Sequence, residues 1–367
     1  QQNWNFMCAD CHSTNLQKNY QASSDSFSTS WSEISVGCEA CHGPGGAHVA
    51  WADREPGERA SLPDNGLTHR FDERANAQWL MSPGDVTARR SAANDNRVEV
   101  EVCASCHSRR GILREGAARE ASFLDHYMPA LLTDGLYHPD GQIRDEVFVW
   151  GSFVQSRMFA AGVTCRDCHD PHRQQLKLPG DTVCLQCHQA KAFATPVHHH
   201  HAPESTGARC ANCHMPETTY MVVDPRRDHS IRIPRPDKST QLGAPNACTA
   251  CHSDQPVEWA ETHFRGWYPE VGEPFQSWGE TFTAARSGHP TAGSQLAQMV
   301  FDEQLPDIAR ATAVLELERY LSQDTAPAIQ AALRDDSPLR RMAAARALSG
   351  LPPTRALPFT AHLLQDD

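Results

Sequence analysis

The sequence contains little of what usually builds a large apolar core. Aromatic residues make up only 7% of its 367 positions, whereas glycine and proline contribute 22 and 25 residues. No apolar run approaches the roughly 20 residues that a membrane-spanning helix requires, so no transmembrane segment is expected. The chain opens with Gln1-Gln2-Asn3-Trp4 and not with a signal peptide. This composition predicts that something other than aromatic side chains fills much of the interior.

Positive charge is also scarce. Lysine and arginine number 33 against 45 aspartates and glutamates, which gives a formal net charge of -12. A chain this acidic is unsuited to binding nucleic acid or an anionic membrane surface. Nucleic acid is therefore excluded as an expected partner.

No cysteine lies outside one repeated pattern, because all 14 belong to seven copies of Cys-x-x-Cys-His. Zinc sites, redox dithiols and disulfides also use paired cysteines. None of these needs a histidine directly after every second cysteine, whereas covalent haem attachment does. In that chemistry two thiols add to the porphyrin vinyl groups. The predicted attachment residues are Cys8, Cys11, Cys38, Cys41, Cys103, Cys106, Cys165, Cys168, Cys184, Cys187, Cys210, Cys213, Cys248 and Cys251.

The histidine that ends each motif is the predicted proximal ligand of a haem iron. These ligands are His12, His42, His107, His169, His188, His214 and His252. We therefore predict seven haem c groups, whose volume replaces the missing apolar core. Haem c is attached outside the cytoplasm, so a periplasmic or extracellular location is expected after removal of a leader.

Candidates for the second axial position come from the other histidines of the 20 in the chain. Their number suffices for bis-histidine ligation at most or all sites. The run at residues 198–201 has a second interpretation as a surface metal-binding tract. Methionine also stays open as an axial ligand, and it would raise the reduction potential. The distal candidates are His48, His126, His138, His172, His198, His200, His201 and His229.

The chain changes character near residue 255. Residues 1–254 hold all seven motifs, and residues 165–252 hold four of them. This spacing leaves room for one short helix and a loop per haem, and it predicts that the last four haems lie close together. We predict a mainly α fold with much irregular loop: a multihaem cytochrome c domain packed around covalent haems at residues 1–254, then an α-helical solenoid at residues 255–367.

The solenoid prediction depends on helical periodicity and on a repeat. Ile308, Ala311 and Val314 mark one apolar helical face. Pro306 and Pro338 occupy similar helix-start positions 32 residues apart, a period typical of HEAT or tetratricopeptide repeats. A plain helical bundle is the alternative. The last repeat stops where its next helix should begin, so the domain is expected to be incomplete at its C-terminus.

Several stretches carry a resemblance to a known family. They are residues 7–15, 37–45, 162–172, 213–216 and 224–229, the first four of which include parts of the haem motifs. Together they resemble bacterial multihaem c-type cytochromes with a C-terminal tetratricopeptide- or HEAT-like solenoid, loosely related to the tetrahaem electron carrier of ammonia oxidisers. The resemblance covers roughly residues 1–350. It implies secretion and electron transfer, and it implies that a further haem module often precedes this segment.

Three functions follow from these features. The first is electron transfer along closely spaced haems, in which the protein sets distances, axial ligands and local charge. The second is a multihaem reductase or oxidase with one open iron, acting on a small nitrogen or sulfur compound. The third, compatible with the first, is self-association into a dimer or a conducting extracellular filament. We expect redox proteins as partners, bound by the solenoid, although the solenoid has an alternative role as a cap. We expect a carrier, not a catalyst.

Overall fold

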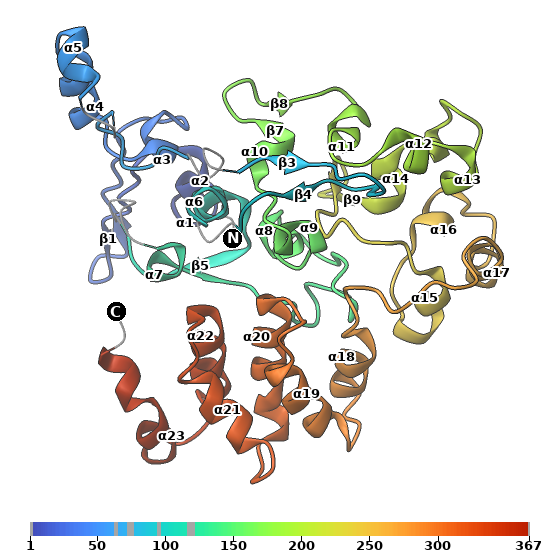
Figure 1. The fold of residues 1–367 in the computed structure, drawn as a ribbon. Coiled ribbons are helices and arrows are strands. Elements are labelled where there is room, and N and C mark those ends of the chain that lie inside the picture. Colours follow the sequence, from blue (N-terminus) through green and yellow to red (C-terminus); the bar gives the residue numbers. More distant parts are fainter. Residues whose placement is uncertain (1–2, 62–64, 72–76, 94–96, 116–121, 366–367) are drawn as a thin grey trace. The chain divides into compact units, whose positions relative to one another are not determined.

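The structure is a computed structural model that describes residues 3–61, 65–71, 77–93, 97–115 and 122–365. The chain divides into two compact units, one of residues 1–78 and 91–129 and the other of residues 79–90 and 130–367. Helices and loops dominate, and the sheets within the described residues are two-stranded antiparallel pairs (Figure 1). The prediction of a mainly helical fold with much irregular loop is confirmed.

The first unit consists of short helices and two small ladders. Asp10 and Arg110 form an ion pair that joins α2 to β5. Lys18 is only 3% exposed and bonds to the Glu115 carboxylate at 3.0 Å, so a buried cation is compensated here. The elements are α1 (Trp4–Met7), α2 (Ala9–His12), β1 (Tyr20–Gln21), β2 (Ser26–Phe27), α3 (Glu39–His42), α4 (Gly46–Ala52), α5 (Pro56–Arg59), α6 (Val98–His107), β5 (Arg110–Ile112), α7 (Phe123–His126) and β6 (Tyr127–Pro129).

The motif-bearing part of the second unit is built mostly from short elements, apart from α17 at its end. Its longest ladder pairs β9 with β10, from Glu217 opposite Arg227 to Tyr220 opposite Asp224. The elements are β3 (Trp79–Leu80), β4 (Arg89–Arg90), α8 (Trp150–Phe153), α9 (Arg157–Ala160), α10 (Cys165–Cys168), β7 (His169–Asp170), β8 (Gln175–Leu176), α11 (Thr182–Leu185), α12 (Ala190–Phe193), α13 (Pro196–His199), η1 (Thr206–Ala208), α14 (Cys210–His214), β9 (Glu217–Tyr220), β10 (Asp224–Arg227), α15 (Pro236–Leu242), α16 (Ala247–Cys251) and α17 (Val257–Trp267).

Longer helices follow in the same unit and form a row in Figure 1. Helix α19 packs on α18 and α20, and α22 packs on α20 and α21. This order is what stacked helix pairs produce. The elements are α18 (Gly279–Arg286), α19 (Ala292–Phe301), α20 (Asp307–Glu316), η2 (Leu317–Tyr320), α21 (Ala326–Ala332), α22 (Pro338–Ala347), α23 (Pro353–Thr360) and η3 (Ala361–Gln365).

Helix α20 is buried on more than the one apolar face that the periodicity predicts. Ile308, Ala311 and Val314 are buried as expected, but Ala309 and Ala313 are equally inaccessible. The reason is its central position, since α19 and α22 both pack on it. The start of α22 agrees with its sequence: Ser337 caps the helix by accepting a hydrogen bond from the Arg340 amide at 3.4 Å, and proline follows it.

The repeats are anchored on residues 130–155 of the same unit. Arg286 donates to the carbonyl of Tyr137 at 3.2 Å, and the Leu132 amide donates to the Thr312 hydroxyl at 3.0 Å. Trp278 and Phe282 are at most 1% exposed. The domain boundary after residue 254 stays a prediction, because the compact units follow a different division. No helix among the described ranges has the length and apolar character needed to cross a membrane.

Candidate haem sites

All seven motifs lie on or directly beside a single helical turn, as predicted. They occupy α2, α3, α6, α10, α11, α14 and α16. In such a turn the two cysteines at i and i+3 and the histidine at i+4 share one face. The amide of the motif histidine closes the turn by donating to the first cysteine, as His42 does to Cys38 at 2.9 Å and His252 does to Cys248 at 2.8 Å. The helical turn therefore presents two thiols and one imidazole together.

Local capping explains why some of these helices start where they do. Thr164 and Asp167 form a capping box at α10, in which the Thr164 amide donates to the Asp167 carboxylate at 2.8 Å. Asn246 caps α16 by accepting from the Thr249 amide at 3.0 Å. Very short helices are unstable alone, so these caps and the surrounding contacts set their boundaries.

The protonation of several ring nitrogens follows from their hydrogen bonds. Nδ1 of His214 lies 2.8 Å from the carbonyl oxygen of Arg232, and Nδ1 of His42 lies 2.8 Å from that of His69. A carbonyl only accepts, so Nδ1 donates in both cases and the lone pair remains on Nε2. This is the arrangement of a metal-binding histidine, whose second nitrogen is held by an outer partner. At His188 that partner is the Thr87 hydroxyl, at 3.1 Å.

Among the described residues, at least three motif histidines have their rings close to a histidine from elsewhere in the chain. The ring centroids of His214 and His198 are 6.1 Å apart with an interplanar angle of 8°. His169 and His229 are 6.3 Å apart at 29°. In each pair the partner is one of the distal candidates.

The third facing pair joins the seventh motif to the histidine run. His252 and His201 have ring centroids 6.1 Å apart and an interplanar angle of 29°. A metal–imidazole bond is about 2 Å long and the ring centre lies about 1 Å behind the bonded nitrogen, so two imidazoles that bind one iron end to end through Nε2 have centroids about 6 Å apart. The centroid spacing of all three pairs therefore fits a haem iron.

The distal members of two pairs are oriented in the same way as the motif histidines. Nδ1 of His229 lies 2.9 Å from the carbonyl of Arg227, and Nδ1 of His201 bonds to the carbonyl of His199. Each ring is thus the tautomer that carries its lone pair on Nε2. No sequence pattern could have identified these acceptors, because every residue carries a carbonyl.

The other distal candidates lie in different surroundings. His48 stacks on Trp51 with centroids 5.4 Å apart, and its Nδ1 bonds to the Asn65 carbonyl at 2.7 Å. His200 has a left-handed backbone and stacks on Trp267 at 4.2 Å. The remaining three are His126, which is 6% exposed; His138, whose pKa is lowered by burial; and His172, whose amide bonds to Asp170 at 3.1 Å.

A cavity of about 280 Å³ lies in the first unit beside the first and third motifs. Asp10 and Val102, which belong to the helices of those motifs, form part of its wall. His126 and Lys18 line it as well, and so does His69, whose carbonyl orients His42. The cavity therefore brings side chains of separate segments together next to two attachment sites.

Successive motifs of the second unit lie next to each other. The side-chain amide of Gln186, in the fifth motif, donates to the backbone carbonyl of Asp167, in the fourth, at 2.9 Å. The thiols of Cys184 in the fifth motif and Cys210 in the sixth interact, which raises the pKa of Cys210 and lowers that of Cys184. After haem attachment these sulfur atoms would be thioethers without a proton, so the contact then indicates only that the two motifs are adjacent.

The sixth motif continues the sequence to the seventh. Burial, and after it the nearby Cys248 and Cys251, raise the pKa of Cys213 to about 11, and helix α14 contacts α16. In the first unit the Cys11 thiol lies 3.7 Å from the carbonyl of Cys106, so the first and third motifs are also adjacent. The close grouping that the sequence predicts for the last four motifs is present.

Comparison with known proteins identifies three parts of the chain. A family model for cytochrome c554 and c-prime matches residues 1–43, a model for a doubled CXXCH motif matches residues 158–193, and a model for HEAT repeats matches residues 294–367. No curated protein matches. A solved structure titled "Crystal Structure of Outer Cell Wall Cytochrome OcwA" is similar at 16% identity and a TM-score of 0.48, over 94% of this chain and 76% of that chain. The chain is a multihaem c-type cytochrome with HEAT-type repeats in its C-terminal part.

Proposed function

We propose that this protein is an electron carrier outside the cytoplasm that holds seven haem c groups, mostly between two histidines. The observation that carries the proposal is the spacing of the three facing pairs. The ring centroids lie 6.1 to 6.3 Å apart in the pairs His214–His198, His169–His229 and His252–His201, which is the separation of two imidazoles bound to one iron. A six-coordinate iron has no position left for substrate, which favours electron transfer over catalysis.

Bound haem would supply the one-electron chemistry of iron. The chain's own residues hold each group in place. The cysteine pairs would attach it covalently, the motif histidine would bind the iron, and the second histidine of the pair would keep water and small ligands from it. Carbonyl groups such as that of Arg232 keep each imidazole in the tautomer that binds through Nε2.

Close contact between motifs supports transfer along the chain of sites. Phe193 lies edge-on to both His188 of the fifth motif and His198, with centroids 5.5 and 5.2 Å away. His198 pairs with His214 of the sixth motif. The Phe193 ring therefore contacts one histidine of the fifth site and one of the sixth. Together with the thiol contacts, this supports one electron path through the last four haems.

The remaining candidates are proposed as distal ligands of the other four motifs. These motifs end in His12, His42, His107 and His188. The five unassigned candidates are His48, His126, His138, His172 and His200. Of these, His48 has the hydrogen bond expected of an iron ligand that binds through Nε2, because its Nδ1 donates to the Asn65 carbonyl.

Spectroscopy of the purified holoprotein tests the proposal against the reductase alternative. We expect a mass equal to the mature chain plus seven haems, low-spin ferric signals from every site, and no spectral change when carbon monoxide is added to the reduced protein. A high-spin ferric component together with a carbon monoxide or nitrite shift would instead identify an open iron and favour a reductase of small nitrogen or sulfur compounds.

We also propose that the C-terminal repeats bind a partner redox protein, since stacked helix pairs offer an extended surface. Charge reversal at exposed residues of the repeats, such as Glu318 and Arg319, should then slow electron delivery to that partner while leaving the haem spectra unchanged. An unchanged rate would assign the repeats a capping role. Self-association into a dimer or filament is a separate possibility, and light scattering that finds only monomers would exclude it.

A further inference from the structure

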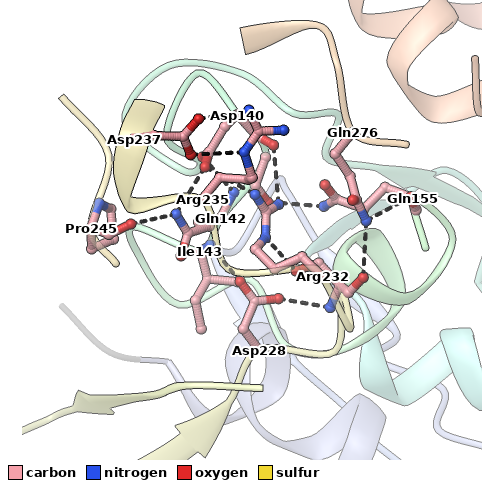
Figure 2. Close-up of polar contacts among 12 residues, drawn as sticks. Asp140, Gln142, Ile143, Gln155, Asp228, Arg232, Arg235, Asp237, Pro245 and Gln276 are labelled. Atoms are coloured by element: carbon pink, nitrogen blue, oxygen red, sulfur yellow. Dashed lines mark hydrogen bonds and ion pairs between the residues drawn. The ribbon is translucent and has the colours of Figure 1, made fainter. Parts of the chain in front are cut away.

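A buried polar cluster in the second unit joins the loop around Asp140 to residues 227–232 (Figure 2). Arg232 is 8% exposed, yet each guanidinium nitrogen donates: Nη1 to the Asp140 carboxylate at 2.9 Å, Nη2 to the Asp140 carbonyl at 3.0 Å and Nε to the Ser230 hydroxyl at 3.0 Å. Asp228 is 2% exposed and accepts from the amides of Ser230 at 2.8 Å and Ile143 at 3.2 Å. Buried charges this well compensated hold one geometry.

The backbone of the same segment holds two of the facing histidines. The Arg232 carbonyl accepts from Nδ1 of His214 at 2.8 Å, and the Arg232 amide donates to the His214 carbonyl at 3.2 Å. Five residues earlier, the Arg227 carbonyl accepts from Nδ1 of His229 at 2.9 Å. The side chains that fix residues 228–232 therefore also fix the acceptors of two imidazoles that belong to different sites.

The cluster continues to two further parts of the unit. Gln142 bonds to the Asp140 carboxylate at 2.8 Å and to the Pro245 carbonyl at 2.7 Å, directly before the Asn246 cap of the seventh motif's helix. Gln276, from the segment that leads into α18, donates to the Ser230 carbonyl at 3.1 Å. The segment is thus tied to rigid neighbours on both sides.

We propose that Arg232, Asp140 and Asp228 are positioning residues that set the imidazole orientations of His214 and His229 together. The proposal rests on the ligand assignment made above. A hydrogen bond to Nδ1 controls both the tautomer and the rotation of a metal-binding ring. The electron paramagnetic resonance (EPR) signal of a low-spin ferric haem depends on the angle between its two imidazole planes, so a displaced acceptor changes that signal.

The test is an Arg232→Gln variant of the full-length holoprotein, compared with Arg235→Gln as a matched control. Arg235 lies three residues further along. Within the described part of the chain its guanidinium bonds to Asp237 at 2.7 Å and to the Gly272 carbonyl at 3.0 Å, and not to residues 227–232. We expect Arg232→Gln to retain the wild-type number of haems while two of the low-spin EPR signals shift and the midpoint potentials of two haems change. Arg232→Lys, which keeps the charge, should restore part of the shift, and Arg235→Gln should match the wild type.

Unshifted signals in Arg232→Gln, or an equal shift in Arg235→Gln, would overturn the proposal. If Arg232→Gln does not fold, Asp140→Asn and Ser230→Ala each weaken one contact of the guanidinium, and both must shift the same two signals. The ligand assignment is tested separately by His229→Ala. If that variant leaves all low-spin signals intact, the proposed function fails at this site; if it removes one signal and Arg232→Gln shifts none, only the positioning role fails.

Discussion

The two ring nitrogens of a motif histidine have different tasks at the proposed haem sites. In the pair of His198 and His214, the ring of His214 supplies Nε2 to the site while its Nδ1 is held by a backbone carbonyl. The two rings are nearly parallel, with 8° between their planes. Burial of His214 lowers its pKa, which favours the neutral ring that binds a metal. The tautomer and the pKa of a motif histidine thus depend on residues outside the Cys-x-x-Cys-His motif.

The first prediction concerns the distal member of this pair. In His198→Ala the cysteines and the proximal histidine remain, so the haem should stay attached while its iron loses one axial ligand. We expect an unchanged mass increment for haem and the appearance of one high-spin ferric signal by electron paramagnetic resonance. His289→Ala is the control, since His289 is exposed and bonds only locally to Thr291 at 2.9 Å. A high-spin signal in both variants, or in neither, contradicts the assignment.

The second prediction concerns Gly141, next to the half-buried Asp140. Its φ is +90° and an added Cβ would overlap the side-chain oxygen of Gln155. Gly141→Ala should therefore destabilise the protein by about 2–3 kcal/mol, from backbone strain and steric overlap together. Gly135→Ala is the matched control, because Gly135 has a φ of +85° but open space around it. Thermal unfolding followed by circular dichroism should show a clearly larger loss for Gly141→Ala; equal losses would exclude the steric contribution.

Helices of two kinds make up the fold. Those that carry haem motifs are mostly four or five residues long, as α2 and α14 are, which is too short for independent stability. The repeat helices are longer and bury small apolar residues, such as Ala343, Ala344 and Ala347 on α22. The first kind depends on caps, covalent attachment and neighbours, whereas the second depends on helix packing.

The third prediction tests that difference on α20. Ile308 is fully buried, so Ile308→Ala should cost about 2–5 kcal/mol in the free energy of unfolding, through lost transfer energy and a cavity. Leu357→Ala on α23 is the comparison, because Leu357 is 54% exposed and its truncation should change stability by less than about 0.5 kcal/mol. Denaturant unfolding followed by far-ultraviolet circular dichroism measures both. A similar cost for the two variants would contradict the central packing of α20.

Charge acts on the whole molecule. The chain has a formal net charge of -12, and the propionates of each haem add further negative charge. The resulting field attracts cationic partners and repels anionic ones over a distance that salt shortens, from about 30 Å at 0.01 M to about 8 Å at 0.15 M.

The fourth prediction follows from this field. The second-order rate of electron exchange with a small basic cytochrome should fall about tenfold between 0.01 and 0.15 M salt, because steering weakens. An acidic electron-transfer protein of similar size serves as the control, and its rate should rise over the same range. Stopped-flow absorbance measures both rates. Equal salt dependence for the two partners would show that local patches, and not net charge, govern encounter.

The sequence by itself determined the cofactor chemistry, since a histidine after every second cysteine specifies an attachment site within one helical turn. It also determined the division between short motif helices and longer repeat helices, because helical periodicity is a local property. The burial of Ala309 and Ala313 on α20 was not foreseen, since it requires two neighbouring helices.

Only the tertiary structure decided which histidines meet. His198 faces His214 from 16 residues away, whereas His229 faces His169 from 60 residues away, and no local pattern distinguishes these from the other candidates. Likewise, Arg232 and Asp140 look like ordinary charged residues in the sequence, yet their burial against each other places a carbonyl beside His214. The physical reason is that chain folding brings together groups whose chemistry is complementary only at close range, and sequence separation carries no information about that distance.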